Sequence, residues 1–172
     1  MNETVRSEQL RVAVTGTAWI GGGIGSVQTA IEELLDSARS EVQIAVYEIT
    51  AGADEFLSRL HTCLAKGLSV TMIINRYQDK SIRTKEKLEE TVRRYPYFEL
   101  LSFQPENSAE DLHAKIIVVD RRAALVGSAN LTWSGLVGNH ELAIVVEGRP
   151  ASTIASLMDK LCADPRSTRV AK

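Results

Sequence analysis

The chain has 172 residues, of which 44% are hydrophobic and 24% are charged, and its formal net charge is −2 at pH 7. This length and composition are typical of one globular domain with a sizeable core, so we expect a single domain over residues 1–172. The near-neutral charge excludes a protein that attracts nucleic acid over its whole surface. No apolar run is long enough to cross a membrane and residues 1–9 contain no apolar signal core, so we expect a cytoplasmic protein.

Hydrophobic periodicity predicts strands and helices in alternation. The expected elements are, in chain order, a strand at 11–15, a helix at 26–38, a strand at 42–48, a helix at 54–66, a strand at 68–74, a helix at 81–94, strands at 98–103, 116–119, 123–126 and 141–146, and a helix at 151–162. We expect residues 1–9 and 164–172 to be loose tails. The alternation predicts an α/β fold in which a mixed central β-sheet is flanked by helices on both faces.

Individual residues mark several element boundaries. Ser26 can cap the first helix, Gly67 follows the second helix as a stop signal, and Pro150 can open the last helix. The polar residues 120–122 separate two apolar runs, which predicts a hairpin.

Cysteine and glycine patterns exclude two kinds of site. Cys63 and Cys162 are far apart, have neither a metal nor a redox spacing, and fall in expected helices, so we expect buried hydrophobic side chains. The glycine-rich loop at residues 16–25 lies between a strand and a helix, as in dinucleotide-binding folds, with Glu48 as the candidate ribose-binding acid. Its glycines have the wrong spacing for that fingerprint, and no P-loop motif is present. We therefore expect a mobile loop near the active site.

The stretch from residue 113 to residue 141 contains groups suited to phosphate chemistry. His113 and Lys115 are two residues apart beside an apolar run, so in a strand their side chains would point to the same face. Residues 127–130, Gly-Ser-Ala-Asn, follow the next expected strand. A neutral histidine can attack phosphorus or move a proton near pH 7, and lysine, serine and asparagine can stabilise the charge on phosphoryl oxygens. This inventory requires no metal ion and no cofactor.

The spacing of these groups resembles the His-Lys-Asp signature of the phospholipase D superfamily. In this chain the signature reads His113-x-Lys115-x4-Asp120-x6-Gly127-Ser128-x-Asn130. Asn139-x-Glu141 also lies where single-motif members of the superfamily place an acid that supports the histidine. The signature is long and specifically spaced, and the resemblance implies a phospholipase D-like sandwich over the whole chain.

The resemblance also implies a role for each residue. The implied roles are His113 as nucleophile or general acid/base, Lys115 and Asn130 as ligands of the phosphoryl oxygens, Ser128 as an assisting hydrogen-bond partner, Glu141 as the group that orients His113, and Asp120 and Gly127 as structural residues. The superfamily uses two such His-Lys-Asn sets, and this chain has one, because His61 and His140 stand in no His-x-Lys pattern. A two-fold symmetric homodimer, in which the His113 side chains of both subunits meet, is therefore expected.

Substrate contacts are predicted less directly. Residues 76–94 contain seven basic and four acidic side chains, which form either a positive patch for a phosphate backbone or a solvated helix face of mixed charge. The candidate contacts are Arg76, Lys80 and Arg83 in this segment and Trp133, which can contact a base or serve as plain packing.

Compact single-motif members of the superfamily are mostly DNA endonucleases with little sequence preference. The resemblance therefore implies a metal-independent nuclease that acts on DNA or RNA through a phosphohistidine intermediate. Two alternatives stay open: a phospholipase or other phosphodiesterase, and a nucleic-acid-binding subunit of a larger complex of the phage-defence type.

Overall fold

The computed structural model describes residues 9–19, 21, 23–106 and 110–170. Its strands are β1 (Leu10–Thr15), β2 (Gly25–Ser26), β3 (Glu41–Val46), β4 (Ser69–Asn75), β5 (Phe98–Phe103), β6 (Lys115–Val119), β7 (Ala123–Gly127), β8 (Glu141–Glu147) and β9 (Ser167–Arg169). Its α-helices are α1 (Val27–Asp36), α2 (Asp54–Ala65), α3 (Ile82–Arg94) and α4 (Arg149–Cys162). Three short helical segments complete the described elements: η1 (Thr17–Trp19), η2 (Tyr77–Asp79) and the π-helical η4 (Ser134–Gly138).

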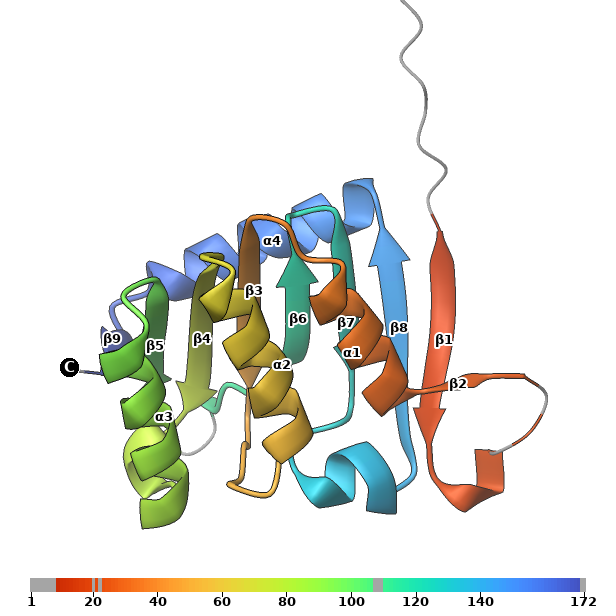
Figure 1. Ribbon diagram of the computed structural model, residues 1–172, viewed down its shortest axis with the longest axis horizontal. Helices are drawn as coiled ribbons and strands as arrows, with labels where there is room; N and C mark the ends of the chain where they lie inside the picture. Colours follow the sequence, from red (N-terminus) through yellow and green to blue (C-terminus); the bar gives the residue numbers. More distant parts are fainter. Residues whose placement is uncertain (1–8, 20, 22, 107–109, 171–172) are drawn as a thin grey trace, which may run out of the picture.

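The described strands form one mixed sheet in the order β2-β1-β8-β7-β6-β3-β4-β5-β9. Strands β3, β4 and β5 are parallel and are joined through α2 and α3, whereas β6, β7, β8 and β1 pair antiparallel. Helices α1, α2 and α3 cover one face and α4 crosses the other (Figure 1). This arrangement confirms the predicted α/β fold with helices on both faces of a mixed sheet.

Two apolar layers hold the helices to the sheet. The larger layer lies under α1, α2 and α3, where Leu35, Leu60 and Leu88 are almost fully buried. On the other face, Ala151, Ala155 and Met158 of α4 pack on the alanine and valine side chains of β3, β6 and β7. Small residues at this contact let α4 lie close to the sheet.

The local signals at helix ends are confirmed. The Ser26 side chain accepts a hydrogen bond from Thr29 N at 2.9 Å and so caps α1. Gly67 has a φ of 83°, the left-handed conformation that ends α2 without the steric cost that a side chain would add. Cys63 is buried and Cys162 half-buried, and both are free thiols.

The prediction of a loose tail at residues 164–172 is wrong for most of that segment. Residues 167–169 form β9, which pairs antiparallel with β5, and Val170 N donates to Leu100 O at 2.9 Å. The Arg166 guanidinium also bonds the Asp164 carboxylate at 2.9 Å and holds its pKa down at about 2. The segment is polar because it closes an exposed sheet edge, where backbone bonds rather than apolar burial fix a strand. Residues 1–8 and 171–172 lie outside the described residues.

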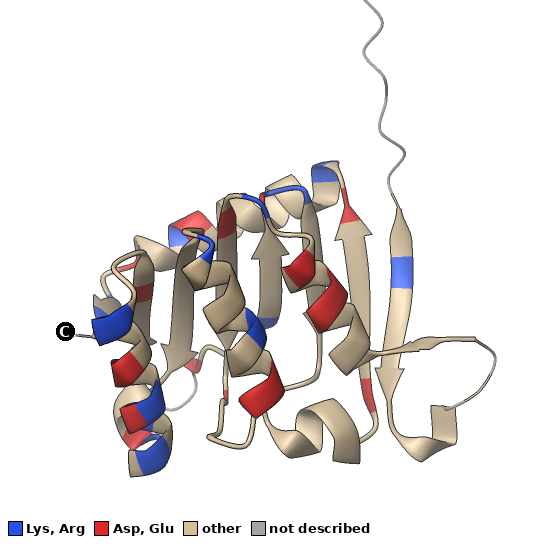
Figure 2. Cartoon of the chain, in the orientation of Figure 1, with Lys and Arg blue, Asp and Glu red and all other residues tan. Residues whose placement is uncertain are grey.

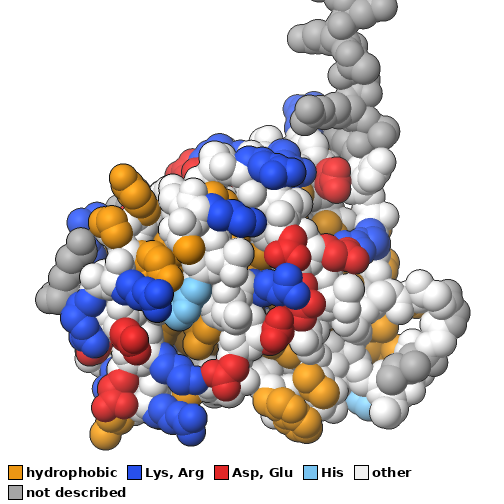
Figure 3. All heavy atoms as spheres, viewed as in Figure 1, with side chains coloured by type: hydrophobic (Ala, Val, Ile, Leu, Met, Phe, Trp, Pro, Cys, Tyr) orange, Lys and Arg blue, Asp and Glu red, His pale blue; other side chains and the backbone are white. Residues whose placement is uncertain are grey.

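Charges of both signs cover the α3 side of the molecule. Lys and Arg alternate with Asp and Glu along α3 (Figure 2), and the same face in Figure 3 shows blue and red patches side by side. Lys87 bonds the carboxylate of Asp54 on α2, and Arg93 lies 3.9 Å from Glu89. Of the two interpretations of residues 76–94, the structure supports the helix face of mixed charge.

Candidate active site

The sheet topology brings all parts of the signature to one end of the sheet. Strand β6 runs antiparallel to β3, with Lys115 opposite Val46, and β7 and β8 each run antiparallel to the strand before. The start of β6, the end of β7, the start of β8 and the end of β3 therefore lie together (Figure 1). This common end carries Glu141 and all residues of the signature except Asp120.

Asp120 lies at the opposite end of β6, in the predicted hairpin. Its carboxylate accepts hydrogen bonds from Ser40 N at 2.8 Å, Ser40 Oγ at 2.9 Å and Arg39 N at 2.9 Å, and from Glu41 N at 3.1 Å. Asp120 and Arg121 have φ values of 50° and 55°, the left-handed conformation of a tight hairpin turn. The contacts of Asp120 thus tie the β6–β7 hairpin to the segment that enters β3.

His113 and Lys115 contact one another at the start of β6. Lys115 Nζ lies 3.0 Å from His113 Nδ1 and donates to the His113 carbonyl oxygen at 2.9 Å. His113 is exposed, whereas only 6% of Lys115 is exposed, and this burial lowers the pKa of the Lys115 ammonium although the charge of Glu141 opposes the shift. The pair thus presents an exposed imidazole beside a cation that is largely shielded from water.

Tyr47 is a further site residue, which sequence reasoning missed. Its ring centroid lies 4.6 Å from that of His113 and 5.3 Å from Lys115 Nζ, so the phenol ring packs against both groups. Tyr47 directly follows β3, and the signal that could have found it is its place at a strand end beside the strand that carries the signature.

Ser128, Asn130 and Glu141 line the same end of the sheet. Asn130 Oδ1 accepts a hydrogen bond from Glu48 N at 3.3 Å, which leaves the amide –NH2 as the donor end of the side chain. The Ser128 hydroxyl donates to the Glu141 carboxylate, and Asn139 Nδ2 donates to its other oxygen at 3.2 Å. Hydroxyl and amide donors therefore surround one carboxylate.

Glu141 does not reach His113 within the chain. Among the described residues, the hydrogen bonds of its carboxylate go to Ser128 and Asn139. The expected orienting contact with His113 is therefore absent from the single chain.

Gly127 is required by close packing. A Cβ at this position would lie 2.6 Å from Leu142 O and 2.7 Å from Ala143 Cβ, closer than real Cβ atoms come. The absence of a side chain lets the end of β7 lie against β8 and so places Ser128 beside Glu141.

The predicted substrate contacts have different surroundings. Lys80 has a side chain that is 7% exposed, and its Nζ donates to Glu48 at 2.7 Å and to Tyr47 O at 3.0 Å, so it is not a surface cation. Arg76 bonds Asp111 at 2.7 Å, and this bond lowers the pKa of the Asp111 carboxyl. Arg83 and Trp133 are exposed. The sequence could not show that the chain after η2 places Lys80 against Tyr47 and Glu48.

The glycine-rich loop is joined to the same end of the molecule. His140 Nε2 accepts a hydrogen bond from Ala18 N at 3.1 Å, and its ring lies edge-on to Trp19 with a centroid distance of 5.6 Å. His140 thus holds η1, the start of the loop, next to the segment that precedes β8.

Comparisons with known proteins show the family to which the chain belongs. The family model described as "Cardiolipin synthase, PLD-like domain" matches residues 31–162. The chain belongs to this family of phospholipase D-like domains. The chain is 27% identical over 133 residues to the DISARM protein DrmC of Bacillus paralicheniformis, covering 76% of this chain and 54% of that protein. It is 29% identical over 142 residues to cardiolipin synthase A of Buchnera aphidicola, covering 78% of this chain and 27% of that protein. The chain thus spans about half or less of the length of these curated relatives.

Solved structures share the fold of this phospholipase D-like domain. The phospholipase D family member Nuc from Salmonella typhimurium superposes with a TM-score of 0.77 at 18% identity, over 96% of this chain and 100% of that one. NucT from Helicobacter pylori superposes with a TM-score of 0.76 at 14% identity, over 95% of this chain and 100% of that one. At these identities the likeness shows the fold.

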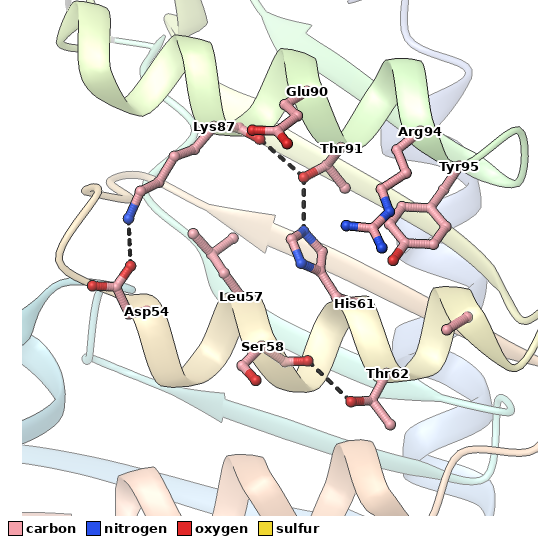
Figure 4. Close-up of a pocket in the computed structure, with 11 residues that line it drawn as sticks. Asp54, Leu57, Ser58, His61, Thr62, Lys87, Glu90, Thr91, Arg94 and Tyr95 are labelled. Carbon is pink, nitrogen blue, oxygen red and sulfur yellow. Dashed lines mark hydrogen bonds and ion pairs between the residues drawn. The ribbon is translucent and has the colours of Figure 1, made fainter.

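A large groove lies away from the signature residues, between α2 and α3. It encloses about 530 Å³, and Leu57, His61, Thr91 and Tyr95 are among its lining residues (Figure 4). A ring nitrogen of His61 lies 2.9 Å from Thr91 Oγ1, and burial, assisted by the charge of Arg94, lowers the His61 pKa. Because Thr91 Oγ1 already donates to a backbone carbonyl, His61 is the donor in this bond, so a contact within the fold satisfies one of its ring nitrogens.

Two further properties concern the described residues. None of their helices is long and apolar enough to cross a membrane. No three of their His, Cys, Asp and Glu side chains cluster in a way that could hold a metal ion.

Proposed function

We propose that this phospholipase D-like domain is a metal-independent phosphodiesterase, and specifically an endonuclease that cleaves DNA or RNA. The observation that carries the proposal is the convergence of His113, Lys115, Ser128 and Asn130 at one end of the sheet. An imidazole next to a shielded cation and to amide and hydroxyl donors suits attack on a phosphodiester and stabilisation of the charge that develops on its oxygens.

The proposed reaction proceeds in two displacements. In the first, a nitrogen of His113 attacks phosphorus, the phosphorus–nitrogen bond forms, and the bond to the leaving oxygen breaks while the partner subunit's His113 protonates that oxygen. In the second, the partner subunit's His113 takes a proton from water, the resulting hydroxide attacks phosphorus, and the phosphohistidine bond breaks. Lys115 and the Asn130 –NH2 group hold the phosphoryl oxygens in both steps, with help from Ser128.

A homodimer is proposed because the chain contains one His-Lys-Asn set. Glu141 bonds Ser128 rather than His113 within the chain, so we assign its orienting role to the dimer, where the partner subunit's His113 enters the same cleft. Symmetry makes either histidine the nucleophile until substrate binds.

An exposed apolar sheet face next to the site is the proposed dimer contact. Val12 and Val126 both pair with Ile144 of β8, so their side chains lie on the same face as Leu142, two residues from Ile144. Val12 and Val126 are each 38% exposed and Leu142 is 44% exposed, beyond the part of the sheet that α4 packs against. This face reaches the catalytic end of β7 and β8, so a second copy seated there would bring its own site close to this one.

Nucleic acid is the favoured substrate, and two observations favour other occupants of the same site. The fold likeness to Nuc and NucT and the exposed Trp133 and Arg83 support a nuclease. Similarity to proteins named cardiolipin synthase A and phospholipase D Y supports a lipid phosphodiesterase. Similarity to the DISARM protein DrmC supports a subunit that works within a larger assembly.

Cleavage of plasmid and single-stranded DNA in excess EDTA tests the proposal. Wild type and His61→Ala should cleave, and His113→Ala should lose nearly all activity, because His61 lies in the groove between α2 and α3 and not at the signature. Equal cleavage by wild type and His113→Ala would refute a mechanism through His113. If neither cleaves while phosphatidylcholine is turned over, the lipid alternative replaces the nuclease.

Light scattering coupled to gel filtration tests the dimer. The wild type should elute as a dimer, and Leu142→Arg should shift the mass toward that of the monomer and reduce activity. Leu157→Arg is the matched control, because Leu157 is 56% exposed on α4 and lies outside the proposed contact. A fully active monomeric wild type would refute the shared site.

A further inference from the structure

The segment between Asn130 and Asn139 is held at both ends by hydrogen bonds to residues of the candidate site. At its start, Leu131 N donates to Glu48 O and Thr50 N donates to Leu131 O, both at 3.1 Å. At its end, Asn139 N donates to Ser134 O at 2.7 Å, and the Asn139 side chain bonds Glu141. Both ends are therefore attached to groups of the site, and the side chains between them have defined positions beside it.

Trp133 is the larger of two apolar side chains that this segment exposes, the other being Val137 at 50%. Trp133 is 63% exposed, whereas Leu131 is 2% and Leu136 is 8% exposed. A Cβ on Gly138 would lie 2.9 Å from the indole ring, so the ring lies directly against the backbone at Gly138, and a side chain there would displace it. One part of the indole is thus supported by backbone while much of its surface faces solvent.

The position of Trp133 relates it to the phosphate site. Trp133 is three residues from Asn130, and three residues of chain span at most about 11 Å. The Asn130 amide is a proposed ligand of the phosphoryl oxygens, so a nucleotide next to the scissile phosphate lies within reach of the indole ring.

The charges around the site suggest that nucleic acid needs a contact other than phosphate attraction in order to bind. Lys80 is buried against Glu48, Arg76 is bonded to Asp111, and the net charge of the chain is −2. Two of the three candidate cations, Lys80 and Arg76, are thus already bonded to carboxylates, and the attraction of the exposed Arg83 for phosphate declines with salt. Stacking on an indole is sequence-tolerant and depends less on salt, because every base has a π face.

We propose that Trp133 is a stacking platform for an unpaired base beside the scissile phosphate and that it gives the site a preference for single-stranded nucleic acid. This inference rests on the proposed nuclease function and names its substrate class. In a duplex the faces of a base are covered by its neighbours, so a duplex offers Trp133 a stacking face only after a base is unstacked. Gly138 supports the platform by leaving room for the ring.

Fluorescence can test the stacking directly, because Trp19 and Trp133 are the two tryptophans of the chain. Trp19→Phe leaves Trp133 as the single tryptophan reporter, and His113→Ala in the same protein prevents cleavage during the titration. A short oligodeoxynucleotide should quench Trp133 emission, and an abasic strand of the same length should not, because it carries the phosphates without the bases.

Cleavage kinetics supply the second readout. Trp133→Ala should reduce kcat/KM for single-stranded DNA about 10-fold, mainly through KM, and should change kcat/KM for duplex DNA less than about 3-fold. Trp133→Phe should restore most of the loss, since phenylalanine keeps an aromatic face. Trp19→Ala is the matched control and should leave the ratio of single-strand to duplex cleavage unchanged.

The results separate this inference from the proposed function. Cleavage of single-stranded DNA without base-dependent quenching, or an equal loss on both substrates in Trp133→Ala, would overturn the stacking role and leave the nuclease intact. If the wild type cleaves no DNA and Trp133 emission instead shifts to the blue with phosphatidylcholine vesicles, the nuclease proposal and the stacking role both fall.

Discussion

Asp120 offers a stability test of the signature that is independent of catalysis. Its carboxylate bonds three successive backbone N–H groups, those of Arg39, Ser40 and Glu41, and its side chain is 10% exposed. It lies at the end of β6 opposite Lys115, about 16 Å away for five residues at 3.3 Å each. We therefore predict that Asp120→Asn destabilises the protein and spares the chemical step.

The magnitude follows from what an asparagine side chain retains at this position. The substituted side chain would keep Oδ1, which accepts from Ser40 and Glu41, and would tolerate the left-handed φ of 50°. It would replace Oδ2 by an –NH2 group, so Arg39 N would lose its 2.9 Å bond and keep only the longer one of 3.2 Å to Oδ1. The negative charge, which also lies 3.5 Å from Arg122 Nε, would be lost. Hydrogen bonds to charged groups contribute about 1.5–3 kcal/mol each. The expected loss is about 2–3 kcal/mol, or about 5–10 °C in Tm for a chain of this length.

The pH dependence of this effect has a defined sign. Burial alone would raise the Asp120 pKa, but the hydrogen bonds from Glu41, Ser40 and Arg39 outweigh it, and the pKa lies below its usual value. A lowered folded pKa contributes stability that is present above the unfolded pKa of about 3.9 and is lost as the pH falls through the folded pKa. The gap between wild type and Asp120→Asn should therefore be constant above about pH 5 and narrow below about pH 4.

Urea denaturation at several pH values, together with kcat measured well below Tm, checks these expectations. Glu33→Gln is the control, because Glu33 forms an exposed ion pair with Arg11 and its loss should cost less than about 0.5 kcal/mol. The reasoning fails if Asp120→Asn costs no more than Glu33→Gln, or if the folded variant loses activity while its stability is unchanged.

Two further predictions concern the proposed catalytic end. Gly127→Ala should lower the free energy of unfolding by about 1–3 kcal/mol and reduce activity, because its Cβ would lie 2.6 Å from Leu142 O. Gly52→Ala is the control and should be near neutral, since the nearest contact of its Cβ would be 3.7 Å away. Thermal melts and initial rates check both variants. A heterodimer of one wild-type and one His113→Ala subunit, purified through two different tags, should lose almost all activity, because both imidazoles serve one shared site; half activity would indicate two independent sites.

Apolar patterning predicted the strands and helices because burial requires it. Val70, Met72 and Ile74 lie on one face of β4 and are buried in the core beneath the helices, which is the two-residue period that marks a strand. The sheet order could not be predicted the same way, because many orders would bury these residues equally. β9 was missed for the opposite reason, since its register with β5 depends on backbone hydrogen bonds and charged side chains.

The spacing of the signature follows strand geometry, so it predicted which residues gather at one end of the sheet. His113 and Lys115 precede or open β6, and Ser128 and Asn130 follow β7, so any fold that pairs these strands as a hairpin brings the groups together. The spacing of the signature does not predict which side chains bond one another. Glu141 bonds Ser128 and Lys80 bonds Glu48 because the loops around them turn in particular ways, which residue spacing does not encode.

Lys80 and Lys115 are two cations of the candidate site with different surroundings. Both are almost buried, at 7% for the Lys80 side chain and 6% for the Lys115 residue, and both lie near the Tyr47 ring. Lys80 is paired with the Glu48 carboxylate at 2.7 Å, whereas in the part of the chain that the structure describes no ion pair joins Lys115 to a carboxylate. Burial without an ion-pair partner lowers the Lys115 pKa although the charge of Glu141 opposes the shift. Under the proposed function, a bound phosphate would offset this desolvation cost.

This contrast makes opposite predictions for two matched variants. Lys80→Met should destabilise the protein by about 1–3 kcal/mol, because it leaves the Glu48 carboxylate without its partner. Lys115→Met should be neutral or slightly stabilising, because it removes an uncompensated buried charge, and it should abolish turnover. Inorganic phosphate should raise the Tm of the wild type and of Lys80→Met but not that of Lys115→Met. Strong destabilisation by Lys115→Met, or phosphate stabilisation that survives in it, would show that Lys115 serves the fold rather than the phosphate.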